Sequence, residues 1–223
     1  MYSVILIFMN SDQETDDVLN TYEKIAADYA TTVKSDVLDH RYIEKFLLLF
    51  KPGQKILDIG VGTGTLSAEM KENHGLDVTA IDFSKEMLDI ARKNHADLKI
   101  LRMDLRDLNF KDESFDGIFA NYSLIHIVEG DVADSIKGMN RVLKPGGLLY
   151  LALQEPITPM DKDGYYPLAY RPELKMFINL FTEDEIKNHL VKTDFKIVSI
   201  ERREPQKETE FPFYKLFIIA EKI

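Results

Sequence analysis

The chain has 223 residues and 45% hydrophobic content, enough for one α/β domain with an appendage and a sizeable core. It contains no cysteine, which excludes disulfides, thiolate metal sites and a cysteine nucleophile, and which allows a reducing compartment. The formal net charge of −10 argues against a nucleic-acid-binding surface, which needs a basic face, and leaves a small-molecule partner open.

The chain begins with an apolar run over residues 1–9. This run has no basic start and no small-residue cleavage site, and it is too short to span a bilayer. Three interpretations remain open: an edge strand, a disordered tail, or a segment upstream of a start codon at Met9. We expect residues 1–13 to form a tail outside the fold and the chain to have no membrane span.

Residues 14–50 follow helical rather than strand periodicity. Tyr22 and Tyr29 fall on one face of the first predicted helix, and a Pro–Gly pair at 52–53 marks the stop. The segment therefore predicts a helical cap that precedes the core.

A short apolar run at residues 55–60 predicts a buried strand that breaks into three glycines, Gly60, Gly62 and Gly64, before a helix at 64–74. A strand, a glycine turn and a helix N-terminus together present free backbone N–H groups at the mouth of a sheet. Glycine also lets a ligand approach the backbone with no Cβ in the way. The motif predicts a ligand site.

The spacing of these glycines differs from G-x-G-x-x-G, the pattern that seats a pyrophosphate on a helix N-terminus. Asp58, two residues before the first glycine, would repel a phosphate and suit a cationic amine. A second predicted strand, 77–82, ends in Asp82, where an acid can accept hydrogen bonds from both hydroxyls of a ribose. These features favour a ligand with a ribose and an amino group but no phosphate.

The middle of the chain alternates between the two periodicities. Predicted strands at 55–60, 77–82, 98–103, 115–122 and 147–154 are separated by helices at 64–74, 84–95 and 130–142, with no helix between 103 and 115. Such alternation predicts a parallel sheet with helices on both faces. Right-handed crossovers then bring the glycine turn, Asp82, Asp104 and Asn121 to one edge of the sheet.

These residues carry a resemblance to a known family. The stretches 57–64 (Leu-Asp-Ile-Gly-Val-Gly-Thr-Gly), 103–104 (Met-Asp) and 143–147 (Leu-Lys-Pro-Gly-Gly), together with Asp82, resemble the successive motifs of class I S-adenosylmethionine-dependent methyltransferases. The resemblance covers about residues 50–155, and four motifs in order make it fairly specific. It implies a doubly wound, Rossmann-like sheet of seven mostly parallel strands, with the last strand antiparallel and an N-terminal helical cap.

The resemblance also implies that the chain binds S-adenosyl-L-methionine and releases S-adenosyl-L-homocysteine. It assigns cofactor contacts to Tyr29, Asp58, Gly60, Gly62, Gly64, Asp82, Phe83, Met87, Asp104, Leu105 and Asn121. Asp58 would hold the methionyl amino group, Asp82 the ribose hydroxyls and Asp104 the adenine 6-amino group. Asn121 would meet the methionyl end of the cofactor, and Tyr29 can face the sulfonium.

Each assignment has a plainer alternative. Asp82 could cap the following helix, although Ser84 is the better cap, and Phe83 and Met87 could pack in the core instead of flanking the adenine. Asp104 could be a solvated turn residue. Tyr29 could pack in the core of the cap.

His126 is the candidate catalytic residue, because a histidine can take a proton from an acceptor hydroxyl near neutral pH. Alternatively, His126 packs in the fold or orients the cap. Methyl transfer does not depend on a catalytic side chain, because positioning alone can supply much of the acceleration, and no metal is required. Residues 121–124 read Asn-Tyr-Ser-Leu and not Asn-Pro-Pro-Tyr, which disfavours a base-flipping nucleic-acid methylase.

After residue 154 the alternation stops. Residues 155–181 predict an irregular aromatic segment at the ligand edge of the sheet, where an acceptor pocket is expected. The candidates for acceptor contacts are Tyr165, Tyr166, Tyr170 and Arg171, together with Tyr22 from the cap. The alternative is a loop that folds its aromatic residues into the core. Residues 182–223 then predict a helix at 182–192 and an antiparallel pair of strands at 195–203 and 211–221.

We therefore expect a single domain over residues 1–223, divided into a tail (1–13), a cap (14–50), a cofactor core (51–154), an acceptor insertion (155–181) and a C-terminal helix and hairpin (182–223). The predicted function is methyl transfer to a small organic acceptor at O, N or C. The alternatives are a non-catalytic sensor or scaffold that binds the cofactor, and a nicotinamide-dependent oxidoreductase, which the glycine spacing disfavours. We expect a cytoplasmic monomer or homodimer without a nucleic-acid partner.

Overall fold

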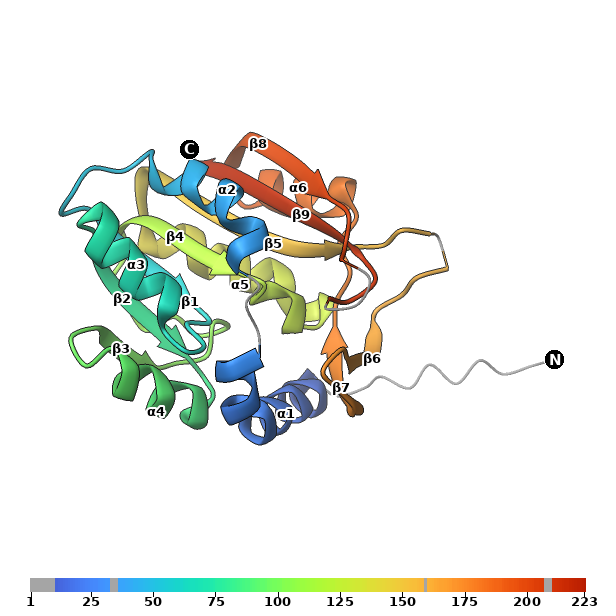
Figure 1. The fold of residues 1–223 in the computed structure, drawn as a ribbon. Helices are drawn as coiled ribbons and strands as arrows, with labels where there is room; N and C mark the ends of the chain where they lie inside the picture. The colour runs from blue at the N-terminus through green and yellow to red at the C-terminus, as the bar shows by residue number, and fades with distance from the viewer. Residues whose placement is uncertain (1–10, 33–35, 159, 207–209) are drawn as a thin grey trace.

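The computed structural model describes residues 11–32, 36–158, 160–206 and 210–223 (Figure 1). The prediction made for residues 1–9 lies outside this range. Among the described residues, seven strands form one sheet in the order β3-β2-β1-β4-β5-β9-β8. Their bounds are β1 Lys55–Ile59, β2 Asp77–Asp82, β3 Lys99–Arg102, β4 Phe115–Asn121, β5 Leu143–Glu155, β8 Phe195–Arg203 and β9 Tyr214–Lys222.

Strand β9 is antiparallel to both of its neighbours, and the other pairs in the sheet are parallel. The chain thus has the doubly wound sheet that the alternation of periodicities predicted, with the last strand inserted in the opposite direction. The carboxyl ends of β1, β2, β3 and β4 share one edge as a consequence.

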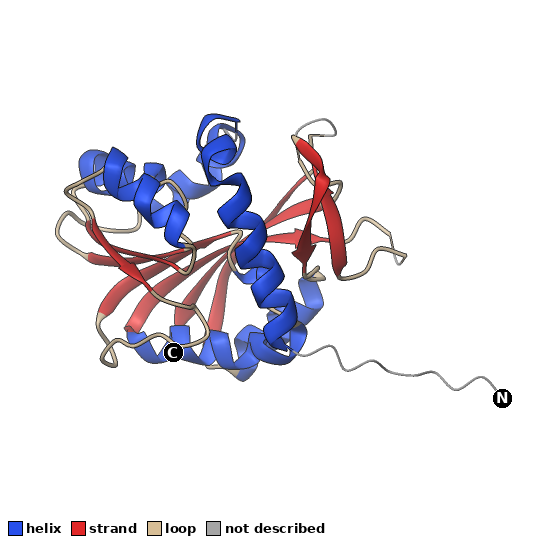
Figure 2. Ribbon diagram, turned by 90° about the horizontal axis from the view of Figure 1, so that it is seen from below, coloured by secondary structure: helices blue, strands red, loops and turns tan. Residues whose placement is uncertain are grey.

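Two layers of helices cover the sheet, as Figure 2 shows from below. The helices are α1 Ser11–Thr32, α2 Asp36–Leu47, α3 Thr65–His74, α4 Lys85–Asn94, α5 Glu129–Val142 and α6 Glu183–Lys192, with a short 3-10 turn, η1, at Leu124–His126. None of the helices in the described part of the chain is both long and apolar enough to cross a bilayer.

Successive side chains of the central strands enter different hydrophobic clusters because a strand alternates its faces. On β4, Ile118 packs in the cluster that holds α5 and α6, whereas its neighbour Phe119 packs in the cluster that holds α2. Phe119 stacks on Tyr150 of β5 with ring centroids 4.9 Å apart. These two buried layers fix the positions of the strand ends that form the site.

Local signals in the sequence set the ends of several helices. Helix α6 begins with a capping box, in which the Thr182 hydroxyl accepts from the Glu185 N–H at 3.3 Å and the Glu185 carboxylate accepts from the Thr182 N–H at 2.9 Å. Helix α4 is capped by Ser84, whose hydroxyl accepts from the Met87 N–H at 3.3 Å. Ser84, not Asp82, is therefore the cap of this helix.

The predicted irregular segment at 155–181 is wrong in part. Residues Gly164–Leu168 (β6) and Arg171–Ile178 (β7) form an antiparallel hairpin beside the main sheet. Prolines at 167 and 172 suggested a loop, but a two-stranded ribbon has free edges where a missing N–H is tolerated. The hairpin contacts α1 and η1, so it closes the same edge of the sheet as the cap.

Candidate functional site

A cavity of about 530 Å³ lies at the carboxyl ends of the parallel strands. The turn after β1 forms its floor, α1 and η1 cover it, and the ends of β2 and β4 and the residues after β3 form its sides. Twelve predicted residues line it: Tyr22, Tyr29, Asp58, Gly60, Gly62, Asp82, Phe83, Met87, Asp104, Leu105, Asn121 and His126. The topology brings these residues together from five separate segments.

The three glycines of the turn have different surroundings. Gly62 has φ +54° and faces open space, since a Cβ placed there would meet no described atom within 4 Å. Gly60 has φ +79°, and a Cβ placed there would lie 2.3 Å from the Ser123 hydroxyl. Gly64 does not line the cavity, and a Cβ there would lie 3.2 Å from the Ala91 side chain on α4. On the Cβ side Gly64 thus packs closely against α4, and the cofactor contact predicted for it stays a prediction.

Asp82 at the end of β2 holds the glycine turn. Its carboxylate accepts from the Gly62 N–H at 3.0 Å and from the Ser84 N–H at 2.9 Å. Burial raises the pKa of Asp82 above its usual value, and the backbone donors act in the opposite direction. Each oxygen of a carboxylate can accept more than one hydrogen bond, so Asp82 keeps acceptor capacity toward the cavity.

Two further polar side chains border the cavity near the turn. Asp58 is 3% exposed, and its carboxylate accepts a short hydrogen bond from the Ser67 hydroxyl. The Asn121 Oδ1 atom is buried and has no hydrogen-bond partner among the described residues. A buried acceptor without a donor is costly and indicates a place for a ligand donor.

Asp104 lines the cavity where an adenine contact was expected, but its carboxylate is already paired with Arg106. Its Oδ2 accepts from Arg106 Nη2 at 2.7 Å, and its Oδ1 accepts from the Arg106 N–H at 2.9 Å. Leu105, between the two, lines the cavity as predicted. The ion pair fixes the orientation of Asp104 at the rim.

His126 is held in one tautomer by its two neighbours. Nδ1 lies 3.0 Å from the Phe177 carbonyl oxygen, which can only accept, so Nδ1 carries the hydrogen. Nε2 therefore accepts from the Tyr22 hydroxyl, 2.9 Å away. Burial lowers the pKa of His126 to about 4. At neutral pH the ring is an uncharged base whose Nε2 lone pair is engaged by the Tyr22 hydroxyl.

We expect the buried state of His126 to make folding sensitive to acid. Its pKa is about 4 in the folded protein against ~6.5 in an unfolded chain, so only the unfolded state gains a proton between these values. The free energy of unfolding should fall by at most about 3 kcal/mol as the pH drops through this window, and the His126 contribution should be constant above it.

Urea unfolding of the wild type and of His126→Gln at pH 7.5 and pH 4.5 measures this effect. The difference between the two proteins removes the contributions of other groups, such as Asp82, whose raised pKa acts with the opposite sign. Equal pH dependence in both proteins would contradict the burial of a neutral ring.

Sequence reasoning missed Tyr122, which lies between the two cavities of the molecule. It has φ +55°, a strained value for a tyrosine, and its hydroxyl donates to Asp39 at 2.8 Å. Asp39 is in turn paired with Arg203 at 2.6 Å. An aromatic residue at the last position of the strand predicted for 115–122 was the available signal.

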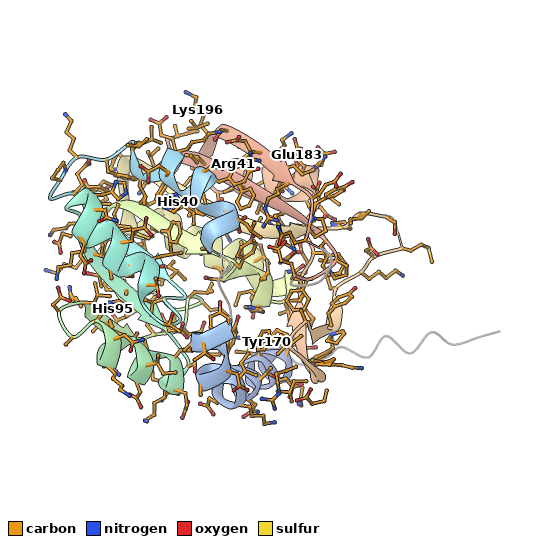
Figure 3. The ribbon with its side chains drawn as sticks, in the orientation of Figure 1. His40, Arg41, His95, Tyr170, Glu183 and Lys196 are labelled. Atoms are coloured by element: carbon orange, nitrogen blue, oxygen red, sulfur yellow. The ribbon has the colours of Figure 1, made fainter. Side chains whose placement is uncertain are left out.

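A second cavity of about 140 Å³ adjoins the first and shares Tyr22, Tyr29, Tyr122 and His126 with it. Tyr170, at the turn of the hairpin beside α1, lines this second cavity (Figure 3). Of the acceptor residues predicted on 155–181, it is the one that the structure brings to a cavity.

Tyr165, Tyr166 and Arg171 line neither cavity, and the acceptor contacts predicted for them stay predictions. The Tyr165 hydroxyl donates to Asp17 of α1 at 2.7 Å, and the Tyr166 hydroxyl donates to the Lys162 carbonyl just before β6. Arg171 forms surface ion pairs with Asp28 and with an acid on β7. Tyr165 and Arg171 thus join the hairpin to α1, while Tyr166 packs against Phe213.

Comparison with known proteins adds an independent finding. A family model described as a methyltransferase domain matches residues 56–147. The chain is 33% identical over 161 residues to a demethylmenaquinone methyltransferase of Paenarthrobacter aurescens (69% of this chain, 62% of the relative). It is 35% identical over 147 residues to one of Renibacterium salmoninarum (63% of this chain, 60% of the relative). The chain thus covers less than two thirds of these relatives.

Solved structures share the fold. A SAM-dependent methyltransferase from Methanosarcina mazei has a TM-score of 0.70 at 24% identity, over 86% of this chain and 99% of that one. The 1,6-didemethyltoxoflavin-N1-methyltransferase of Burkholderia thailandensis, solved with S-adenosylhomocysteine, has a TM-score of 0.71 at 18% identity, over 96% and 91%. At these identities the likeness concerns the fold alone.

Proposed function

Since the core of this chain is a class I S-adenosylmethionine-dependent methyltransferase domain, we propose that the protein transfers the methyl group of S-adenosylmethionine to a small organic acceptor. The observation that carries the proposal is the chemistry of the main cavity. It combines an open glycine backbone at Gly62, carboxylates at Asp58 and Asp82, and an unpartnered buried acceptor at Asn121. This donor and acceptor set fits a cationic, ribose-bearing ligand.

The residues that would hold the cofactor follow from their positions. Asp58 and Asn121, at the ends of β1 and β4, would bind the amino group of the methionyl end. Asp82 would accept from the ribose hydroxyls, and Met87 would form an apolar wall for the adenine near Asp104. The bound cofactor supplies a methyl group on a sulfonium, which leaves readily. The protein needs mainly to orient the acceptor and to exclude water.

Tyr22 and His126 are suited to remove a proton from the methyl acceptor. His126 Nε2 is an uncharged base that is already engaged with the Tyr22 hydroxyl, and both side chains line the main cavity. We propose that His126 takes the proton of an acceptor hydroxyl or N–H, directly or through Tyr22, while the Phe177 carbonyl holds the imidazole in place.

The experiment that tests this function is methyl transfer from isotope-labelled S-adenosylmethionine to a panel of small acceptors. The panel should include demethylmenaquinone, which the names of the relatives identify as their acceptor, together with hydroxylated aromatic and N-heterocyclic compounds. Labelled product supports the proposal. Tight cofactor binding without turnover on the whole panel would instead favour a sensor or scaffold protein.

We expect Asp82→Ala to weaken binding of S-adenosylhomocysteine by roughly 1–3 kcal/mol, because the variant loses the acceptor for the ribose and loosens the turn at Gly62. Asp77→Ala is the matched control, since Asp77 is an exposed acid at the opposite end of the same strand. Titration calorimetry of both variants measures the effect. Unchanged affinity in Asp82→Ala would show that the ribose assignment is wrong.

The remaining predictions concern the location, the partners, the oligomeric state and the domain limits of the protein. A cytoplasmic location, the absence of a nucleic-acid partner and a monomeric or homodimeric state stay predictions from the sequence, as do the domain limits given above.

A further inference from the structure

The second cavity, called the chamber below, adjoins the main cavity. The two share Tyr22, Tyr29, Tyr122 and His126 in their linings. Its other sides are largely apolar and come from α1, the hairpin and the segment before β9, with Ile25, Leu168, Met176 and Phe211 among them. A ligand that spans both cavities would have one end near His126 and its body between apolar walls.

One end of this chamber holds a buried positive charge. Lys215 is 1% exposed, and its Nζ donates to Gln154 Oε1 at 2.7 Å, the Phe211 carbonyl at 2.9 Å and the Phe213 carbonyl at 3.1 Å. All three acceptors are neutral. Burial lowers the pKa of Lys215 to about 8, so the amine is still mostly protonated at pH 7. Its hydrogen-bond partners are all neutral, and Glu210 and Asp39, which raise its pKa, act on its charge without a direct hydrogen bond.

The acid that shares this chamber is committed elsewhere. The Glu210 carboxylate pairs with Arg203 at 2.8 Å and accepts from the Gln206 N–H at 2.7 Å. Within the described part of the chain, no carboxylate lies at ion-pair distance from Lys215. The charge of Lys215 is thus balanced at longer range by Glu210 and Asp39, which also pair with Arg203, and not by a carboxylate in contact with the ammonium.

Tyr170 supplies the second observation. Its hydroxyl is buried and has no hydrogen-bond partner among the described residues, although it lines the same chamber. A buried hydroxyl normally finds a partner, because an unmade hydrogen bond costs about 1–3 kcal/mol. A hydroxyl left free at a cavity wall is a donor for a ligand oxygen.

We propose that the second cavity receives the methyl acceptor and selects one whose far end carries an anionic oxygen, a carboxylate or an ionised hydroxyl, on an apolar ring. Tyr170 donates a hydrogen bond to that oxygen, and Lys215 provides the compensating charge. This inference rests on the proposed function and adds the residues that decide specificity. Neither residue touches the methyl group, so both act by binding the acceptor.

Matched pairs of small probes test the charge preference. Benzoate and pentafluorophenolate are ionised at pH 7, and benzamide and pentafluorobenzene are their neutral counterparts of similar shape. Ligand-observed NMR titrations on the protein saturated with S-adenosylhomocysteine give the four affinities. We expect at least one anion to bind about tenfold more tightly than its counterpart, and the stronger pair distinguishes carboxylate from ionised hydroxyl. Equal affinities within both pairs would overturn the proposal.

Variants then assign the preference to the chamber. Tyr170→Phe removes a hydroxyl that has no hydrogen-bond partner among the described residues, so we expect the fold to be retained and the anion affinity to fall about fivefold. Tyr166→Phe is the matched control on the same hairpin outside both cavities, and it should leave the affinity unchanged. Lys215→Met should abolish the difference between anion and neutral probe. Where that variant does not fold, Tyr170→Phe decides: full anion affinity in it would overturn the proposal.

Affinity for S-adenosylhomocysteine separates this inference from the proposed function. The wild type and Tyr170→Phe should bind it equally. Absence of binding to the wild type would refute the methyltransferase function itself, whereas normal binding without an anion preference would refute only the role given to the second cavity.

Discussion

Gly62→Val should reduce the affinity for S-adenosylhomocysteine by more than about 100-fold, or about 2.7 kcal/mol, while the protein remains folded. Gly62 lines the main cavity and its Cβ direction is open, so we expect a valine side chain to occupy volume that the cofactor needs; its Cβ would meet no described atom within 4 Å. Titration calorimetry measures the affinity, and circular dichroism with thermal melting monitors the fold.

The positive φ of Gly62 makes a control necessary, because a non-glycine residue in this region costs about 1–2 kcal/mol of stability. Gly53 has φ +85°, faces open space and lies outside both cavities. Gly53→Val should therefore lose a similar amount of stability and keep full affinity. Normal binding by Gly62→Val would mean that the cofactor does not lie against this turn.

Gly60→Ala should have its largest effect on stability and lower the free energy of unfolding by about 2–5 kcal/mol. The new Cβ would lie 2.3 Å from the Ser123 hydroxyl, which donates to the Ile59 carbonyl and thereby joins the ends of β1 and β4. The strained φ of +79° adds to this clash. Urea unfolding measures the loss.

Two further variants separate the clash from the strain. Gly62 has a positive φ, but a Cβ there meets no described atom, so Gly62→Ala should lower the free energy of unfolding by less than Gly60→Ala does. Adding Ser123→Gly to Gly60→Ala removes the side-chain atoms that the new Cβ would meet. The double variant should lose about 1–3 kcal/mol less free energy of unfolding than the sum of the losses in the two single variants. Strictly additive losses would show that Ser123 does not press on Gly60.

These glycines illustrate what the sequence could and could not predict. Their spacing located the turn, its strand and its helix, and it indicated a ligand without a pyrophosphate. It did not distinguish Gly62, whose Cβ direction is open, from the two glycines whose Cβ direction meets Ser123 or Ala91. Those contacts come from residues distant in sequence, and they are defined only once β4 and α4 are in place.

The residues that line the second cavity were harder to predict for a related reason. The aromatic residues on 155–181 were visible, but the hairpin register decides which of them face a cavity, and prolines at 167 and 172 concealed the hairpin. Lys215 lay in a predicted strand as an ordinary polar residue. Its burial goes with contacts to Gln154 on β5 and to the carbonyls of Phe211 and Phe213, which its position in a strand does not indicate.

The central claim is that the main cavity binds a cationic nucleoside thioether and does not bind a dinucleotide. Titration calorimetry of the wild type with S-adenosylmethionine, S-adenosylhomocysteine and NADH tests it most directly. We expect one molecule of either S-adenosyl compound to bind per chain and NADH to give no signal. Binding of NADH, or no binding of either S-adenosyl compound, would contradict the claim.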